Sequence, residues 1–183
     1  MSCYISQGVS LNECSDSIGG IKKIYIAGGT GTTLGGVTGF TYDSDDQITG
    51  ATAASGTVFY GFELKRGTSS LTQNIQKSFD NGTIYFDQEL LAVMYKYDAD
   101  KRLILQNLTQ KDNLQIIAID QNDTQYMCGQ VRGMYTSAGS ATTGLALGDR
   151  NGFEITFLGQ EPVPARIIDG VLASVFVGAT FSG

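Results

Sequence analysis

A chain of 183 residues with 42% apolar content is long enough for one domain with a substantial core, and one domain is what we expect. Twenty-four glycines against two prolines, with no tryptophan, predict a mostly β protein whose strands are joined by tight turns. The net charge of −6, from 12 Lys and Arg against 18 Asp and Glu, argues against a surface that wraps nucleic acid, because phosphate binding requires clustered cations. An acidic wall that faces DNA without gripping it is compatible with this charge.

The absence of histidine removes the commonest general base and metal ligand, together with every Ser-His-Asp or Cys-His arrangement. The three cysteines include no Cys-x-x-Cys pair, so we expect no metal site and no cofactor. Cys3 and Cys14 are the pair that a disulfide would join, and free thiols in a reducing cytoplasm are the alternative.

Residues 1–20 are small and polar, which predicts an extended N-terminal segment without a secretion signal. A short strand is expected over residues 21–27, followed by a glycine-rich loop at 28–36. This loop lacks the lysine of a P-loop and precedes a strand-like segment at 37–43, so we interpret it as a turn and not as a nucleotide site. Asp residues at 43–46 lack the rest of a calcium loop and indicate a solvated acidic turn.

The longest regular pattern is the alternation over residues 83–96, which predicts a strand. At about 3.3 Å per residue it spans about 46 Å, whereas a usual strand has about five or six residues. We expect residues 58–65 to pair with it. Residues 69–79 and a turn at 80–82 should form a protruding hairpin arm over about 67–81, for which an irregular surface loop is the alternative.

A short helix is expected over residues 98–110. Asp98 is a good N-cap, and Asp100 places a negative charge in the first turn. Leu103, Ile104 and Leu108 recur at helical spacing. This apolar stripe should hold the helix against a sheet.

Beyond the helix, residues 114–120 and 124–131 predict a hairpin, and residues 135–148 are too small and polar to form core. A turn at 149–152 precedes a strand at 153–158. The domain should therefore cover residues 21–165. A C-terminal strand or arm is expected over 166–183, which is apolar on both faces and too short to span a bilayer.

The paired carboxylates Asp87 and Glu89, about 7 Å apart along a strand, have a spacing that glycosidases use. No tryptophan and no aromatic platform accompany them. We therefore expect neither an enzyme nor a catalytic residue.

Extended arms that add strands to a neighbour's sheet favour a structural subunit, since repeated head-to-tail contacts give rings or tubes. We expect the arm to contact a neighbour and its deletion to leave a folded monomer. The predicted oligomer interface consists of Leu71, Gln73, Ile75, Lys77, Phe79, Val171 and Val175.

Four segments, at residues 61–66, 82–90, 98–102 and 144–157, resemble virion structural proteins of tailed bacteriophages. The order of the expected elements resembles that of the tail-tube (major tail protein) family, over roughly residues 20–165. The resemblance implies a β-sandwich or small barrel with one short helix and a long protruding hairpin.

This resemblance also implies a homo-oligomeric ring, commonly a hexamer, that stacks into a channel for genomic DNA in the virion tail after synthesis in the host cytoplasm. Its partners would be other virion tail proteins and passing DNA, with no membrane, and an acidic lumen would let the DNA slide. A phage neck, ring or baseplate protein and a carbohydrate-binding β-sandwich module are the alternatives.

Overall fold

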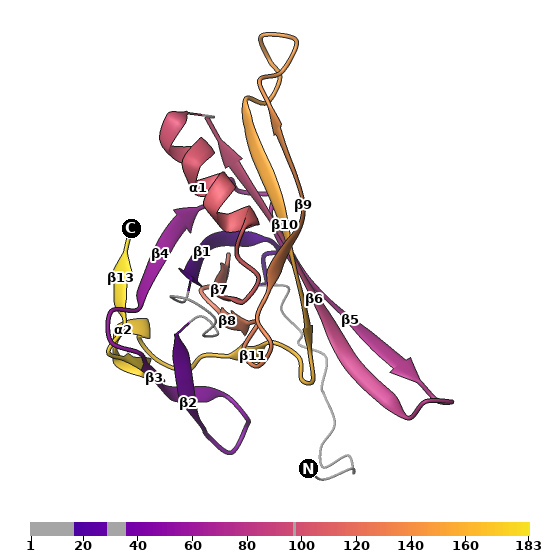
Figure 1. Cartoon of the computed structure of the whole chain (residues 1–183), viewed down its shortest axis with the longest axis vertical. Helices are drawn as coiled ribbons and strands as arrows, with labels where there is room; N and C mark the ends of the chain where they lie inside the picture. Colours follow the sequence, from indigo (N-terminus) through magenta and orange to yellow (C-terminus); the bar gives the residue numbers. More distant parts are fainter. Residues whose placement is uncertain (1–16, 29–35, 97) are drawn as a thin grey trace.

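The computed structural model describes residues 17–28, 36–96 and 98–183 (Figure 1). The expected N-terminal segment up to residue 16, the Cys3–Cys14 pair and most of the glycine-rich loop lie outside these residues. Within the described residues the two helices are α1 (Ala99–Thr109) and α2 (Leu172–Val175). The strands are β1 (Ile21–Gly28), β2 (Val37–Tyr42), β3 (Ile48–Ala53), β4 (Val58–Glu63), β5 (Ser70–Ser78), β6 (Thr83–Tyr95), β7 (Leu114–Asp120), β8 (Gln125–Cys128), β9 (Tyr135–Thr142), β10 (Gly152–Glu161), β11 (Arg166–Ile167), β12 (Phe176–Val177) and β13 (Thr180–Ser182).

The protein is mostly β, as predicted, and its strands form three sheets. A six-stranded sheet has the order β11-β8-β7-β1-β4-β13, a four-stranded sheet the order β5-β6-β10-β9, and a three-stranded sheet the order β12-β3-β2. Within the described residues none of them closes into a barrel. The expected single helix is joined by a second, the four-residue α2.

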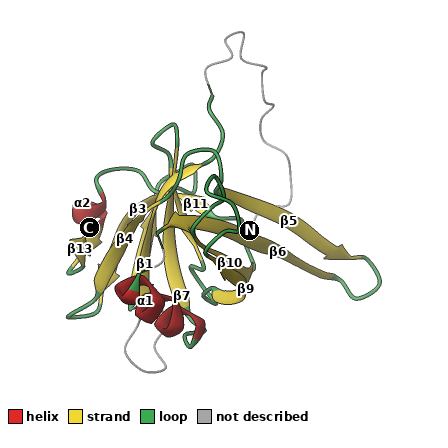
Figure 2. Cartoon of the chain, turned by 90° about the horizontal axis from the view of Figure 1, so that it is seen from above, coloured by secondary structure: helices red, strands yellow, loops and turns green. Residues whose placement is uncertain are grey.

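The six-stranded sheet is the middle layer, because side chains from both of its faces are buried. On β1, Ile24 and Ile26 enter one core cluster and Ala27 enters the other. On β7, Ile116 enters the first cluster and Ile117 enters the second. Apolar side chains of β6 and β10 cover the first face. The three-stranded sheet and the C-terminal segment cover the second face. Figure 2 shows the backbone of β6 and β10 to one side of β1 and β7.

β6 confirms the predicted long strand, and its burial rises from exposed Thr83 to buried Val93. Its partners are β5 and β10. The expected pairing with residues 58–65 is wrong, because β4 pairs with β1 and β13 in the middle sheet. After β4 the chain crosses to the four-stranded sheet, where the Lys65 N–H donates to the Val93 carbonyl at 3.4 Å.

α1 begins as predicted, with the Asp98 carboxylate accepting the backbone N–H of Lys101 at 3.0 Å. Leu108 is buried and Ile104 packs against the first core cluster. Leu103, the third member of the predicted apolar stripe, is exposed. The helix therefore touches the core along a narrow line.

The C-terminal segment differs from the expected strand or arm. Its residues fold back as β11, α2, β12 and β13, and β12 and β13 pair in parallel with β3 and β4. Val175 and Phe176 are buried in the second core cluster. Much of the apolar surface that was expected to need a neighbour is thus covered by the chain itself.

Candidate functional site

Two hairpins project from opposite ends of the four-stranded sheet (Figure 1). The β5–β6 hairpin turns after the pair Ser78–Thr83. The β9–β10 hairpin turns after the pair Thr142–Gly152, and Gly152 pairs with Tyr95 at the far end of β6. Each hairpin therefore extends the sheet in its own direction.

The tip of the β5–β6 hairpin carries apolar side chains in solvent. Phe79 is 92% exposed, and Ile75 and Ile84 are exposed on the strands that lead to it. Gly82 closes the turn with a φ of +62°, a conformation that glycine adopts without steric cost. This structure confirms the predicted hairpin arm.

The β9–β10 loop presents two more apolar side chains, Leu145 and Leu147, which are fully exposed. The Asp149 carboxylate accepts the backbone N–H groups of Leu145 and Ala146 at 2.9 and 2.7 Å. These two bonds hold the pKa of Asp149 below its ordinary value. Hydrogen bonds within the loop therefore fix its conformation.

The predicted interface residues fall into two groups. Ile75, Lys77, Phe79 and Val171 are exposed, as an interface requires. The other three serve the chain itself: Leu71 packs against the first core cluster, the Gln73 side chain accepts the Ala165 N–H at 2.7 Å, and Val175 is only 3% exposed. Val175 is therefore a core residue, because α2 turns it inward.

The edges of the four-stranded sheet are β5 and β9. No strand of the described residues pairs with their outer sides, so each presents a row of backbone groups to solvent. β9 is built from small side chains and is almost entirely exposed. This strand was not predicted from the sequence, because a strand exposed on both faces shows no apolar alternation.

The face of this sheet that points away from the core carries three carboxylates among polar and apolar side chains, Leu91 and Leu158 among the latter. By the alternation of side chains, Asp87, Glu89 and Glu154 lie on it. The other positions of the four strands on this face are uncharged. Lys65 covers one end of the face, where its Nζ lies 4.4 Å from the centre of the Tyr95 ring.

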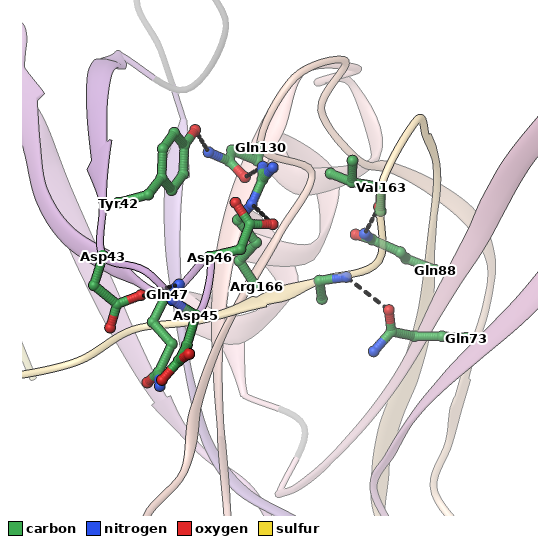
Figure 3. A network of polar contacts seen from close by, with 11 residues as sticks. Tyr42, Asp43, Asp45, Asp46, Gln47, Gln73, Gln88, Gln130, Val163 and Arg166 are labelled. Carbon is green, nitrogen blue, oxygen red and sulfur yellow. Dashed lines mark hydrogen bonds and ion pairs between the residues drawn. The ribbon is translucent and has the colours of Figure 1, made fainter. Parts of the chain in front are cut away.

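A polar network anchors the segment that follows β10 (Figure 3). The Gln88 side chain donates to the Val163 carbonyl at 3.3 Å. Arg166 donates to Asp46 and to the Gln130 side chain, both at 2.8 Å. Gln130 donates in turn to the Tyr42 hydroxyl at 2.7 Å. These contacts join all three sheets.

The predicted acidic turn closes on itself, since the Asp43 carboxylate accepts the N–H groups of Asp45 and Gln47, both at 2.9 Å. Asp46 is paired with Arg166. In the part of the chain that the structure describes, no three His, Cys, Asp or Glu residues come together as a candidate metal site. The turn thus has a structural role.

Glu161, at the end of β10, is a fully buried carboxylate. It accepts backbone N–H groups of Val131, Arg132 and Gly133, the shortest at 2.7 Å. Burial raises its pKa, and these three bonds oppose that rise. Burial also raises the pKa of the nearby Cys128 thiol to about 12, which leaves the thiol protonated and unreactive.

A groove of about 530 Å³ lies between α1 and the β4–β13 edge. Ile26, Phe62, Ile104 and Leu108 form part of its apolar lining. Its volume is in the usual range for ligand pockets. The residues of the lining with polar side chains are Tyr60, Asn107, Lys111 and Ser182.

The helices of the described residues, of eleven and four residues, are too short and insufficiently apolar to cross a membrane. The chain was compared with models of protein families, with curated proteins and with solved structures. None of these comparisons returns a match.

Proposed function

We propose that this protein is a structural subunit of a phage tail tube, in which identical copies form a ring and the rings stack into a channel for DNA. The observation that carries the proposal is the four-stranded antiparallel sheet with two free edges, β5 of nine residues and β9 of eight. Its other supports are the protruding arm and the acidic open face.

The direction of the two edge strands allows identical copies to join. All three pairings in this sheet are antiparallel, so β5 and β9 run in opposite directions. Placing β9 of one copy beside β5 of an equally oriented copy continues the antiparallel pattern. Such a contact is head-to-tail, and it gives a closed ring when the rotation between copies closes. We expect a hexamer.

The sheet has one free face, because the rest of the domain lies on the other. In a ring, the rest of each domain would lie on the outside of the sheet. The free face of the sheet would then point toward the lumen. Asp87 and Glu89 would then line the channel with Glu154, whose charge is offset by its ion pair with Arg150. Carboxylates repel phosphates, so DNA would pass without being held.

The test is negative-stain electron microscopy of the purified full chain over a range of concentrations. We expect rings with a central channel, and tubes at high concentration. A chain that stays strictly monomeric at high concentration would contradict the proposal.

A further inference from the structure

The two hairpin tips of the four-stranded sheet stand out as apolar surface. Phe79, Leu145 and Leu147 are the three most exposed large apolar side chains among the described residues. None of them belongs to either core cluster. They lie at opposite ends of the sheet, so one copy of the chain has an apolar tip at each end.

The position of the tips separates them from the ring contact. In a closed ring, the lateral edges β5 and β9 are occupied by neighbouring copies. The hairpin tips extend past the ends of the strands, so they then point out of the two faces of the ring. This step rests on the proposed function, since it takes the lateral pairing as given.

The leucine tip is already ordered in the single chain. Besides the two bonds to the Asp149 carboxylate, the Gly144 N–H donates to the Thr142 hydroxyl at 3.1 Å and the Asp149 N–H to the Ala146 carbonyl at 3.0 Å. A preformed loop loses little conformational freedom when it binds. Its cation, Arg150, is paired with Glu154, which disfavours an anionic lipid surface as the partner.

We propose that the hairpin tips make the contact between successive rings, with a second copy of this chain as the partner. Leu145 and Leu147 of one copy pack against the end of a copy in the next ring that carries Phe79. Ring formation and ring stacking therefore depend on different residues of the same sheet.

The test compares three variants by electron microscopy and sedimentation velocity. Leu145→Ser/Leu147→Ser and, separately, Phe79→Ser should form rings of wild-type size and lose the tubes. Leu103→Ser, which changes an exposed leucine on α1, should stack as the wild type does. All substituted side chains lie outside the core clusters, so unchanged circular dichroism confirms folding.

Mixing the two kinds of variant ring sharpens the test, because each keeps one intact tip. The mixture should give pairs of rings and no longer stacks. Tubes formed by either tip variant alone would overturn the inference and leave the ring proposal standing. Tip variants that are monomers would overturn it as well, since the tips would then belong to the ring contact. A wild type without rings would instead defeat the proposed function.

Discussion

Glu161 joins two parts of the chain through a single buried side chain. Its carboxylate is the acceptor for three backbone N–H groups of the turn at residues 131–133. An apolar replacement leaves these donors without a partner. We expect Glu161→Leu to lower the free energy of unfolding by about 1–3 kcal/mol, the cost of an unsatisfied buried donor.

Urea denaturation of wild type and Glu161→Leu measures this loss. Glu89→Leu is the matched control, since it makes the same change at an exposed site and should alter stability by less than about 0.5 kcal/mol. Equal midpoints for wild type and Glu161→Leu would show that the turn does not depend on Glu161.

Asp98 links the stability of α1 to pH. The backbone N–H of Lys101 holds the pKa of this carboxyl below its ordinary value of 3.8. Its contribution to stability is therefore present above pH 3.8 and is lost as the pH falls through the folded-state pKa.

Thermal unfolding at several pH values tests the role of Asp98. Asp98→Ala should melt below wild type at pH 7, and the gap should narrow as the pH falls below 3.8 and the carboxylate loses its charge. Asp98→Asn keeps a capping side chain without a titrating charge, so its Tm should lie near the wild-type Tm at neutral pH. A gap between wild type and Asp98→Ala that does not change with pH would refute this account.

At the scale of elements, the arm is built so that its outer half is dispensable for folding. Leu71 and Gln73 hold the base of the arm to the domain, so deletion of residues 67–81 would disturb the core. Residues 76–85 lie beyond the core clusters, and their neighbours Ile75 and Phe86 face each other in the hairpin. An Asn-Gly turn can replace this segment.

We expect the shortened arm to give a folded protein that does not assemble, because the last three residues of the β5 edge, at 76–78, and the Phe79 tip are lost. Sedimentation velocity measures the assembly, and circular dichroism checks the fold. Asp80→Ser keeps the arm at full length and should assemble as wild type does. Rings of wild-type size from the shortened chain would show that the arm is not an interface.

Elements with a strong local pattern were predictable from the sequence. β6 alternates over its whole length, and α1 begins at a capping aspartate. The partner of β4 was not predictable, since pairing depends on how the chain crosses between layers. The segment with Val171 and Val175 alternates over too few residues to separate a strand from the single helical turn that it forms.

The candidate site was predictable in part. The alternating arm identified Ile75 and Phe79, which the structure places in solvent. Leu145 and Leu147 belong to residues 135–148, for which the sequence predicts only a place outside the core. Their exposure follows from the position of the loop at the end of a hairpin, which no local pattern shows.

At the scale of the whole molecule, three layers leave one sheet with a free acidic face and two free edges. Reversing the charge of that face should convert repulsion of DNA into retention. In an electrophoretic mobility assay at low salt, we expect Asp87→Lys/Glu89→Lys assemblies to bind DNA and wild-type assemblies not to bind. Asp45→Lys/Asp112→Lys, which makes the same change at two exposed carboxylates outside this face, is the control. Equal retention by both variants would place the face outside the channel.

In the proposed ring, the four-stranded sheet continues from one copy to the next through β5 and β9. The most direct test of this pairing uses Thr72→Cys in β5 and Ala138→Cys in β9, joined by a short bismaleimide in a Cys3→Ser/Cys14→Ser background. Buried Cys128 should not react. We expect the chain with both cysteines to give a ladder of covalent oligomers that ends at the ring number, and each single-cysteine chain to give none. A chain with both cysteines that stays monomeric on a denaturing gel would contradict the account.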